Sequence, residues 1–328
     1  MKFFKPVQEK IIPKICACKF FTAHRLLLLS LCAGIAAGVA VTPKKEAFLR
    51  ISKGTTSKQV AQMLKKEKII SSERFFLFLI RVTGNDRKIK SGIYKFHNKN
   101  TELKILSDLA GGKSHKIKVT IPEGFTAAEI AVLLDSASIC SGEKFLDIVG
   151  EKLLEGYLFP DTYFFDIDMS PYLVADVLRD NFNKKFSNDL RKSAVESGLS
   201  EKDTVILASL IEKEAKKDEE RPLISAVFRN RLKKGWHLES CATIIYALGK
   251  HKDRLTYKDT KVNSPYNTYL FPGLPPHPIC NPGISSLNAA IFPADTDAMF
   301  FVSDGAGSHK FSKYFSEHNL NKKKINQR

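Results

Sequence analysis

The chain has 328 residues, of which 43% are hydrophobic and 27% charged, a globular composition that supports two or three modest domains. Its 52 Lys and Arg residues against 35 Asp and Glu give a net charge of +17, which fits either a polyanionic partner or a solvated basic surface. Zinc-spaced cysteines, an RNP-like aromatic strand and an arginine-rich recognition helix are all missing from the sequence, so we expect no nucleic-acid partner.

The N-terminus is typical of a membrane-insertion signal. Residues 26–41 are uncharged and follow a segment rich in Lys and Arg. At ~1.5 Å per residue this run spans about 24 Å of the ~30 Å hydrocarbon core. A cleaved signal peptide is the alternative, but the long basic flank favours an uncleaved anchor. We therefore expect a basic cytoplasmic segment (1–25), a transmembrane helix (26–42) and an extracytoplasmic, periplasmic body held at the cytoplasmic membrane.

Two segments seventy positions apart share a pattern. Each predicts a short strand, a Gly turn, a Thr N-cap at Thr56 or Thr126, and a helix with an apolar stripe; Thr126 and Glu129 also form a predicted capping box. The first copy continues into a second strand and a helix, which predicts a small βααβ module over residues 45–115. Such a module serves recognition, or it reuses a stable supersecondary element.

Residues 204–215 (TVILASLIEKEA) predict the helix that carries the chemistry. Leu207, Leu210 and Ile211 form an apolar face, Glu214 falls on that face, and Glu212 projects to the polar side. A carboxyl against apolar neighbours has a raised pKa, as a general acid near pH 7 requires. The alternative is a buried Glu paired with an Arg for structure.

Residues 221–234 predict a second helix, which begins at a Pro and ends before Gly235. Arg231 lies on its apolar face, where it pairs with Glu214, orients a substrate, or extends along the core boundary.

Turn-rich loops with aromatic and amide side chains surround these helices. Aromatic residues at 157–163 either form a core strand and turn or line a sugar-binding groove. Turn chemistry explains most Pro, Gly and Asn residues of the later loops, but a turn does not require the pair Tyr266 and Asn267. The six cysteines are scattered and do not suggest a disulfide scaffold.

Together these motifs resemble the endolytic murein transglycosylase (YceG-like) family. The matching segments are residues 155–162 (EGYLFPDT), 209–214 (SLIEKE), 220–221, 226–232 (AVFRNRL), Thr243, Tyr246, 266–269 (YNTY), 273–276 (GLPP) and 281–283 (NPG). The resemblance implies an α+β fold with one N-terminal transmembrane helix, a LysM-like module (45–115) and an α+β catalytic domain (116–328).

The family's chemistry is cleavage of the MurNAc–GlcNAc bond of nascent peptidoglycan without water, which leaves a 1,6-anhydroMurNAc end and terminates strand elongation. The resemblance implies Glu214 as the catalytic residue, no cofactor and no metal, and peptidoglycan strands and cell-wall synthases as partners. The substrate-binding residues it implies are Glu155, Tyr157, Arg231, Glu239, Thr243, Tyr266, Asn267 and Asn281.

One segment departs from the family pattern. Residues 239–243 (ESCAT) stand where the family has Gln-Ser-Asp-Pro-Thr, and Trp236 and His237 also differ from its usual residues. Cys241 and Ala242 motivate a second hypothesis, a non-catalytic peptidoglycan-binding scaffold of the cell-wall synthesis machinery. A muramidase is the third, and it differs only in its product.

Overall fold

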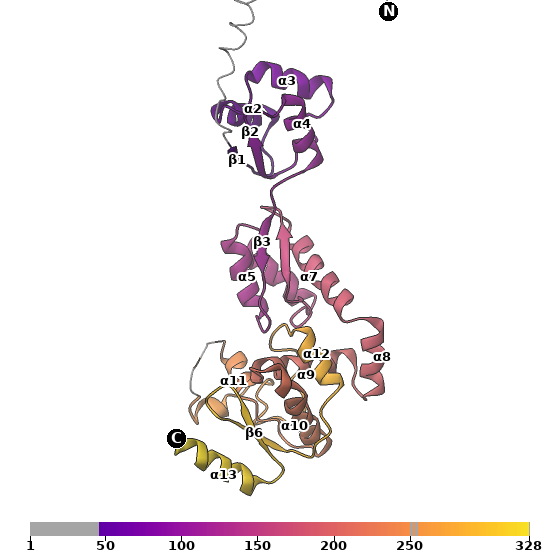
Figure 1. The fold of residues 1–328 in the computed structure, drawn as a ribbon, viewed down its shortest axis with the longest axis vertical. Helices are drawn as coiled ribbons and strands as arrows, with labels where there is room; N and C mark the ends of the chain where they lie inside the picture. The colour runs from indigo at the N-terminus through magenta and orange to yellow at the C-terminus, as the bar shows by residue number, and fades with distance from the viewer. Residues whose placement is uncertain (1–45, 250–251, 253–254, 328) are drawn as a thin grey trace, which may run out of the picture.

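The computed structural model describes residues 46–249, 252 and 255–327, and these form three bodies stacked along the long axis of the molecule (Figure 1). Each body has its own hydrophobic core. Helices and short antiparallel strand pairs occur in all three, so the expected α+β class is confirmed.

The N-terminal body has the predicted βααβ order followed by one further helix. Its elements are β1 (Glu46–Ile51), α2 (Ser57–Lys66), α3 (Glu73–Val82), β2 (Gly92–His97) and α4 (Glu102–Gly111). β1 and β2 pair antiparallel from Glu46↔His97 to Ile51↔Gly92. Every second residue of β1 is buried, because successive side chains of a strand point to opposite faces.

The middle body repeats this order. Its elements are β3 (Ile117–Thr120), α5 (Ala127–Ser136), α6 (Gly142–Glu151), β4 (Thr162–Phe165) and α7 (Pro171–Lys185), and β3 pairs antiparallel with β4. Thr126 caps α5 and forms the predicted capping box with Glu129. Thr56 caps α2 in the same way with Gln59, so both copies carry the box that the sequence predicted for the second.

The C-terminal body is built around one central helix. Its elements are α8 (Asn188–Glu196), α9 (Glu201–Glu214), η1 (Asp218–Glu220), α10 (Arg221–Lys233), α11 (Cys241–Leu248), η2 (Asp259–Lys261), α12 (Ile284–Ile291), β5 (Phe300–Ser303), β6 (His309–Ser312) and α13 (Phe315–Asn326). Residues 204–211 of α9 are all buried, because α8, α10, α11 and α12 pack around this helix. The two predicted helices are therefore confirmed as α9 and α10.

Polar contacts join the bodies in sequence. Arg50 of β1 pairs with Asp168 of the middle body at 3.3 Å, and Ser114 hydrogen-bonds to Asp166. Between the middle and C-terminal bodies, the backbone N–H of Gly124 donates to the carbonyl of Asn281 at 2.9 Å.

The membrane prediction is corrected. Among the described residues the longest helix, α7, has 15 residues, and none is long and apolar enough to cross a bilayer. The predicted fold with a transmembrane helix and the predicted single-pass membrane localisation therefore have no support in this part of the chain. The segment 26–42 itself lies outside the described residues. The domain boundaries at 45 and 115 stay a prediction.

Candidate active site

Glu214 is the last residue of α9, and its carboxyl meets the first turn of α11. The hydroxyl of Ser240, the N-cap of α11, donates to Glu214 Oε1 at 2.5 Å, and the backbone N–H of Ala242 also donates to this carboxyl. The N-terminus of a helix carries partial positive charge. The carboxylate of Glu214 is therefore held by two donors in a field that favours negative charge.

Burial nevertheless raises the pKa of Glu214 above its ordinary value. The Ser240 hydroxyl, the charge of His309 and the Ala242 N–H each lower this pKa, but together they do not offset the loss of hydration. A carboxyl that keeps its proton toward neutral pH and is still supported when it ionises can both donate and accept a proton. This is the behaviour that the helical face predicted.

Glu212, two residues earlier, has a different environment from the one predicted. Its side chain is only 5% exposed, and Oε1 lies 3.1 Å from Nη1 of Arg221. Oε2 accepts the backbone N–H of Gly283 at 3.0 Å. The prediction that Glu212 faces a polar side is wrong, because partners distant in the sequence enclose it.

Arg231 pairs with Glu239 at 3.3 Å. Its guanidinium also donates to the carbonyls of Met299 and Leu238, each at 2.8 Å. Through these bonds the guanidinium joins α10 to the segment before α11 and to the start of β5. Of the alternatives for Arg231, pairing with Glu214 is not observed.

Thr243 positions Ser240, whose hydroxyl donates to Glu214. Its buried hydroxyl donates to the carbonyl of Ser240 at 2.7 Å and lies 3.0 Å from the hydroxyl of Thr268, which accepts the backbone N–H of Ser240 at 3.0 Å. The structure thus places Thr243 behind Ser240, one contact away from Glu214.

Three further side chains lie near Glu214. The thiol of Cys241 lies 3.2 Å from the hydroxyl of Tyr269, and Glu214 raises the pKa of both groups by its charge, although burial is the larger cause. On the β5–β6 hairpin, His309 is held by Glu220 through a 2.7 Å contact at Nδ1 and a 2.9 Å bond from its backbone N–H. Sequence reasoning missed Ser240, Tyr269 and His309 because they reach Glu214 only through the fold.

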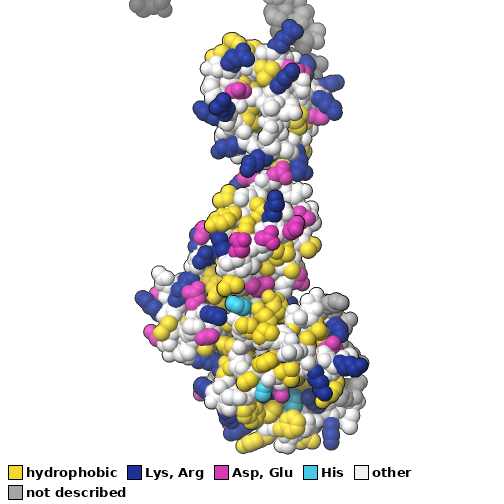
Figure 2. All heavy atoms as spheres, turned by 180° about the vertical axis from the view of Figure 1, so that it is seen from behind, with side chains coloured by type: hydrophobic (Ala, Val, Ile, Leu, Met, Phe, Trp, Pro, Cys, Tyr) yellow, Lys and Arg dark blue, Asp and Glu magenta, His cyan; other side chains and the backbone are white. Residues whose placement is uncertain are grey.

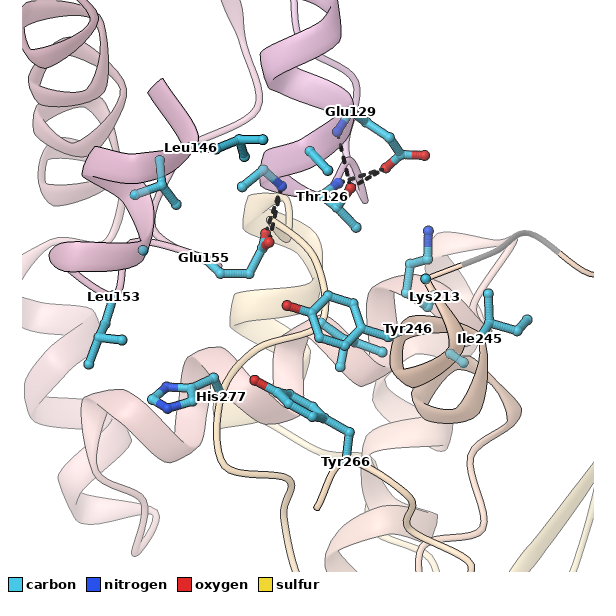
Figure 3. A pocket seen from close by; sticks show the side chains of 17 residues that line it. Thr126, Glu129, Leu146, Leu153, Glu155, Lys213, Ile245, Tyr246, Tyr266 and His277 are labelled. Atoms are coloured by element: carbon cyan, nitrogen blue, oxygen red, sulfur yellow. Dashed lines mark hydrogen bonds between the residues drawn. The ribbon is translucent and has the colours of Figure 1, made fainter. Parts of the chain in front are cut away.

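A cavity of about 540 Å³ lies beside Glu214, between α5 and α6 of the middle body and α11 of the C-terminal body. Ala242, which hydrogen-bonds to Glu214, and Lys213, which precedes it, both line this cavity. The rings of Tyr246 and Tyr266 lie 4.9 Å apart and point their hydroxyls into the same space, opposite His277 (Figure 3). Aromatic faces beside hydroxyls suit a sugar ring, which has an apolar face and a polar rim.

Glu155 forms the opposite wall of the cavity, where its carboxyl accepts the backbone N–H of Ala127 at 3.0 and 3.1 Å (Figure 3). Oε1 also accepts from Nδ2 of Asn281 at 2.9 Å. The Asn281 amide in turn accepts the N–H groups of Gly156 and Leu158 and donates to the carbonyl of Phe125, each at 2.9 Å. This network joins the middle body to the loop before α12.

Burial raises the pKa of Glu155 from 4.5 to about 7, although its hydrogen bonds oppose the shift. A folded pKa above the unfolded one means that the folded state binds the proton more tightly, so this stability is present below pH 4.5 and lost as pH rises through about 7. We expect Glu155→Gln, which keeps the accepting oxygen, to remove up to about 3 kcal/mol of pH dependence in this window. Urea unfolding of the wild-type and Glu155→Gln chains at pH 5 and pH 8 measures the pH dependence of the unfolding free energy. The same pH dependence in both chains would contradict the raised pKa of Glu155.

The other predicted site residues, Asn267 and Tyr157, make contacts with neighbouring parts of the protein. Asn267 is fully buried and donates to the carbonyls of Thr260 and Val262 at 3.0 and 2.8 Å. Tyr157 packs edge-on against Phe182 with ring centroids 5.0 Å apart. The part of the chain that the structure describes contains no cluster of three or more His, Cys, Asp or Glu side chains placed to hold a metal.

Several known proteins are similar to this chain in sequence. An endolytic murein transglycosylase of Bacillus subtilis (strain 168) is 33% identical over 307 residues, which cover 84% of each chain. A protein of the same name from Streptococcus pneumoniae (strain ATCC BAA-255 / R6) is 28% identical, and the match covers 80% of this chain and 55% of that protein.

A solved structure and a family model agree with these matches. The crystal structure of a yceG-like protein from Listeria monocytogenes aligns with a TM-score of 0.57 and 29% identity, over 84% of this chain and 98% of that one. The sequence model of the YceG-like family matches residues 49–324, and this range includes α9 with Glu214 and every residue of the cavity wall. The chain therefore belongs to the YceG-like family.

Proposed function

We propose that this chain cuts the glycan strands of peptidoglycan internally, as an endolytic murein transglycosylase, with Glu214 as its acid and base. The observation that carries the proposal is the setting of Glu214, a carboxyl with a raised pKa whose ionised form is held by Ser240 and Ala242 at the start of α11. Membership of the YceG-like family and relatives named endolytic murein transglycosylase support the substrate.

The reaction needs one carboxyl that acts twice. Protonated Glu214 gives its proton to the glycosidic oxygen as the bond to C1 of the muramic acid breaks. The resulting carboxylate takes the proton of the C6 hydroxyl of the same sugar, and that oxygen bonds to C1. Glu214 recovers its proton, the product is a 1,6-anhydro end, and no water enters. The second carboxylate that ordinary glycosidases require is not needed.

The cavity beside Glu214 is the proposed position of the sugars on one side of the cleaved bond. Tyr246 and Tyr266 offer ring faces and hydroxyls, and Ala242 joins the cavity wall to the Glu214 carboxyl. Glu155 and Asn281 hold the wall that α5 contributes. Their proposed part in binding is to keep the two bodies at the spacing that a sugar requires.

The N-terminal body is proposed as a LysM-like module that holds the strand away from the cut. A shallow groove on its surface is lined by Arg50, Ser52, Thr55, Gln59 and Gln62 together with Met63 and Lys66. Hydroxyl, amide and cationic groups are suited to hydrogen-bonding sugars and to meeting the carboxyl groups of peptidoglycan. The body is joined to the middle one by the Arg50–Asp168 pair.

Strand length is the observable that tests this function. Purified glycan strands incubated with the full chain are expected to shorten to intermediate lengths, because an internal cut divides a strand before short fragments accumulate. Size-exclusion chromatography resolves the lengths. Binding without any change in length would contradict the enzyme and favour a scaffold.

A further inference from the structure

An aromatic surface begins at Trp236, the only tryptophan of the chain, and continues across the C-terminal body. The Trp236 ring lies 6.1 Å from that of Phe300 on β5, and Phe300 lies 5.6 Å from Phe315 at the start of α13. His318, one turn further along α13, stacks on Phe300 at 5.3 Å. These four side chains form a continuous row of rings, which we term the Trp236 surface.

The outer rings of this row are accessible. Trp236 is 45% exposed and Phe315 60% exposed, whereas Phe300 and His318 lie beneath them and support them. The view from behind shows hydrophobic side chains gathered over the C-terminal body, whereas Lys and Arg are scattered over the N-terminal body (Figure 2). Exposed rings on a supporting layer form a preorganised contact surface, because few rotamers are lost on binding.

A chain of contacts connects the Trp236 surface to the proposed catalytic carboxyl. The guanidinium of Arg231 lies 5.3 Å from the centroid of Phe300, and Arg231 pairs with Glu239. Glu239 precedes Ser240, whose hydroxyl donates to Glu214. The cavity lined by Tyr246 and Tyr266 contains none of the four side chains of the Trp236 surface, so the two are separate features.

Positive charges border the row of rings. The ammonium group of Lys234 lies 5.8 Å from the centroid of the Trp236 ring. Lys322 of α13 acts by its charge on both His318 and Cys241, so it lies near both side chains. Flat rings flanked by cations match a polymer of amino sugars whose muramic acid units carry carboxyl side arms.

We propose that the Trp236 surface is a second glycan subsite, in which Trp236 and Phe315 stack on the faces of sugars that extend from the bond at Glu214. This subsite rests on the proposed function and adds the position of the strand on the far side of the cut. It makes its contacts in the ground state and in the transition state alike, because the rings do not touch the reacting atoms. Its removal therefore raises KM and leaves kcat unchanged.

The single tryptophan makes the subsite directly measurable. Purified glycan strands are added to the full chain carrying Glu214→Gln, so that the strand binds uncut, and Trp236 emission is recorded. We expect a saturable change in emission, and we expect Phe315→Ala in the same background to shift its midpoint to about tenfold higher strand concentration. Phe164→Ala, which removes an equally exposed ring from β4 of the middle body, is the matched control and is expected to leave the midpoint unchanged.

Kinetics of the active chain complete the test. Trp236→Ala is expected to raise KM for glycan strands about tenfold at unchanged kcat. If the unmodified chain cleaves strands and Trp236→Ala has the same KM, the subsite is overturned and the proposed function stands. Strand binding without any change in Trp236 emission has the same consequence. Absence of both cleavage and strand binding overturns the proposed function and the subsite with it. An emission change with single-stranded DNA but not with glycan strands would also overturn the proposal.

Discussion

Glu214→Gln is expected to reduce the rate of glycan-strand cleavage by about 10²- to 10⁴-fold, the contribution of a positioned acid–base group. The amide can neither give a proton to the leaving oxygen nor take one from the C6 hydroxyl. Fold stability is expected to stay equal or to rise at neutral pH. Burial raises the pKa of Glu214, so the wild-type chain loses this group's stability as pH rises, and the amide does not titrate.

The cleavage rate and the unfolding midpoint measured on one preparation separate catalysis from structure. Glu219→Gln is the matched control, since Glu219 is an exposed carboxylate of η1 and its loss should change neither quantity. A Glu214→Gln chain that unfolds earlier than wild type would show that the Glu214 carboxyl stabilises the fold. One that cuts normally would remove it from the mechanism.

Arg221→Met is expected to destabilise the C-terminal body by about 3–5 kcal/mol, the cost of leaving a buried charge without its partner. Arg221 is buried, pairs with Glu212 at 3.1 Å and Asp218 at 2.8 Å, and lies 4.0 Å from Glu123. Its loss leaves these carboxylates facing one another. Burial is the main cause of the raised pKa of Glu123, and repulsion from Glu212 raises it further.

Trp236 fluorescence during urea unfolding reports on the same body and measures this loss. Lys313→Met removes a cation of similar length from an exposed pair with Asp297 and is expected to change the transition little. If Arg221→Met unfolded at the same urea concentration as wild type, the cluster around Glu212 would contribute no stability.

Local signals in the sequence predicted the elements that depend on neighbouring residues. Thr56 and Thr126 begin their helices as the capping pattern indicates. The apolar positions of α9 predicted that Glu214 lies on the apolar face and has a raised pKa, because helical periodicity fixes which residues share a face.

Contacts between distant segments could not be predicted in this way. Glu212 was expected on a polar side, but Arg221 and the N–H of Gly283 bury it. Asn281 reaches Glu155 across 126 positions, and no periodicity indicates that both ends of its amide are used there. Position on a helix gives the direction of a side chain, and only the fold gives its partners.

The chemistry of the new chain end tests the central claim most directly. Mass spectrometry of fragments released from purified glycan strands distinguishes a 1,6-anhydro end from a reducing end by the mass of one water. If Glu214 alone serves as acid and base, every new end is expected to be the anhydro form. Reducing ends would contradict this account, because they would require a second group, such as the neighbouring Glu239 carboxylate, to activate water.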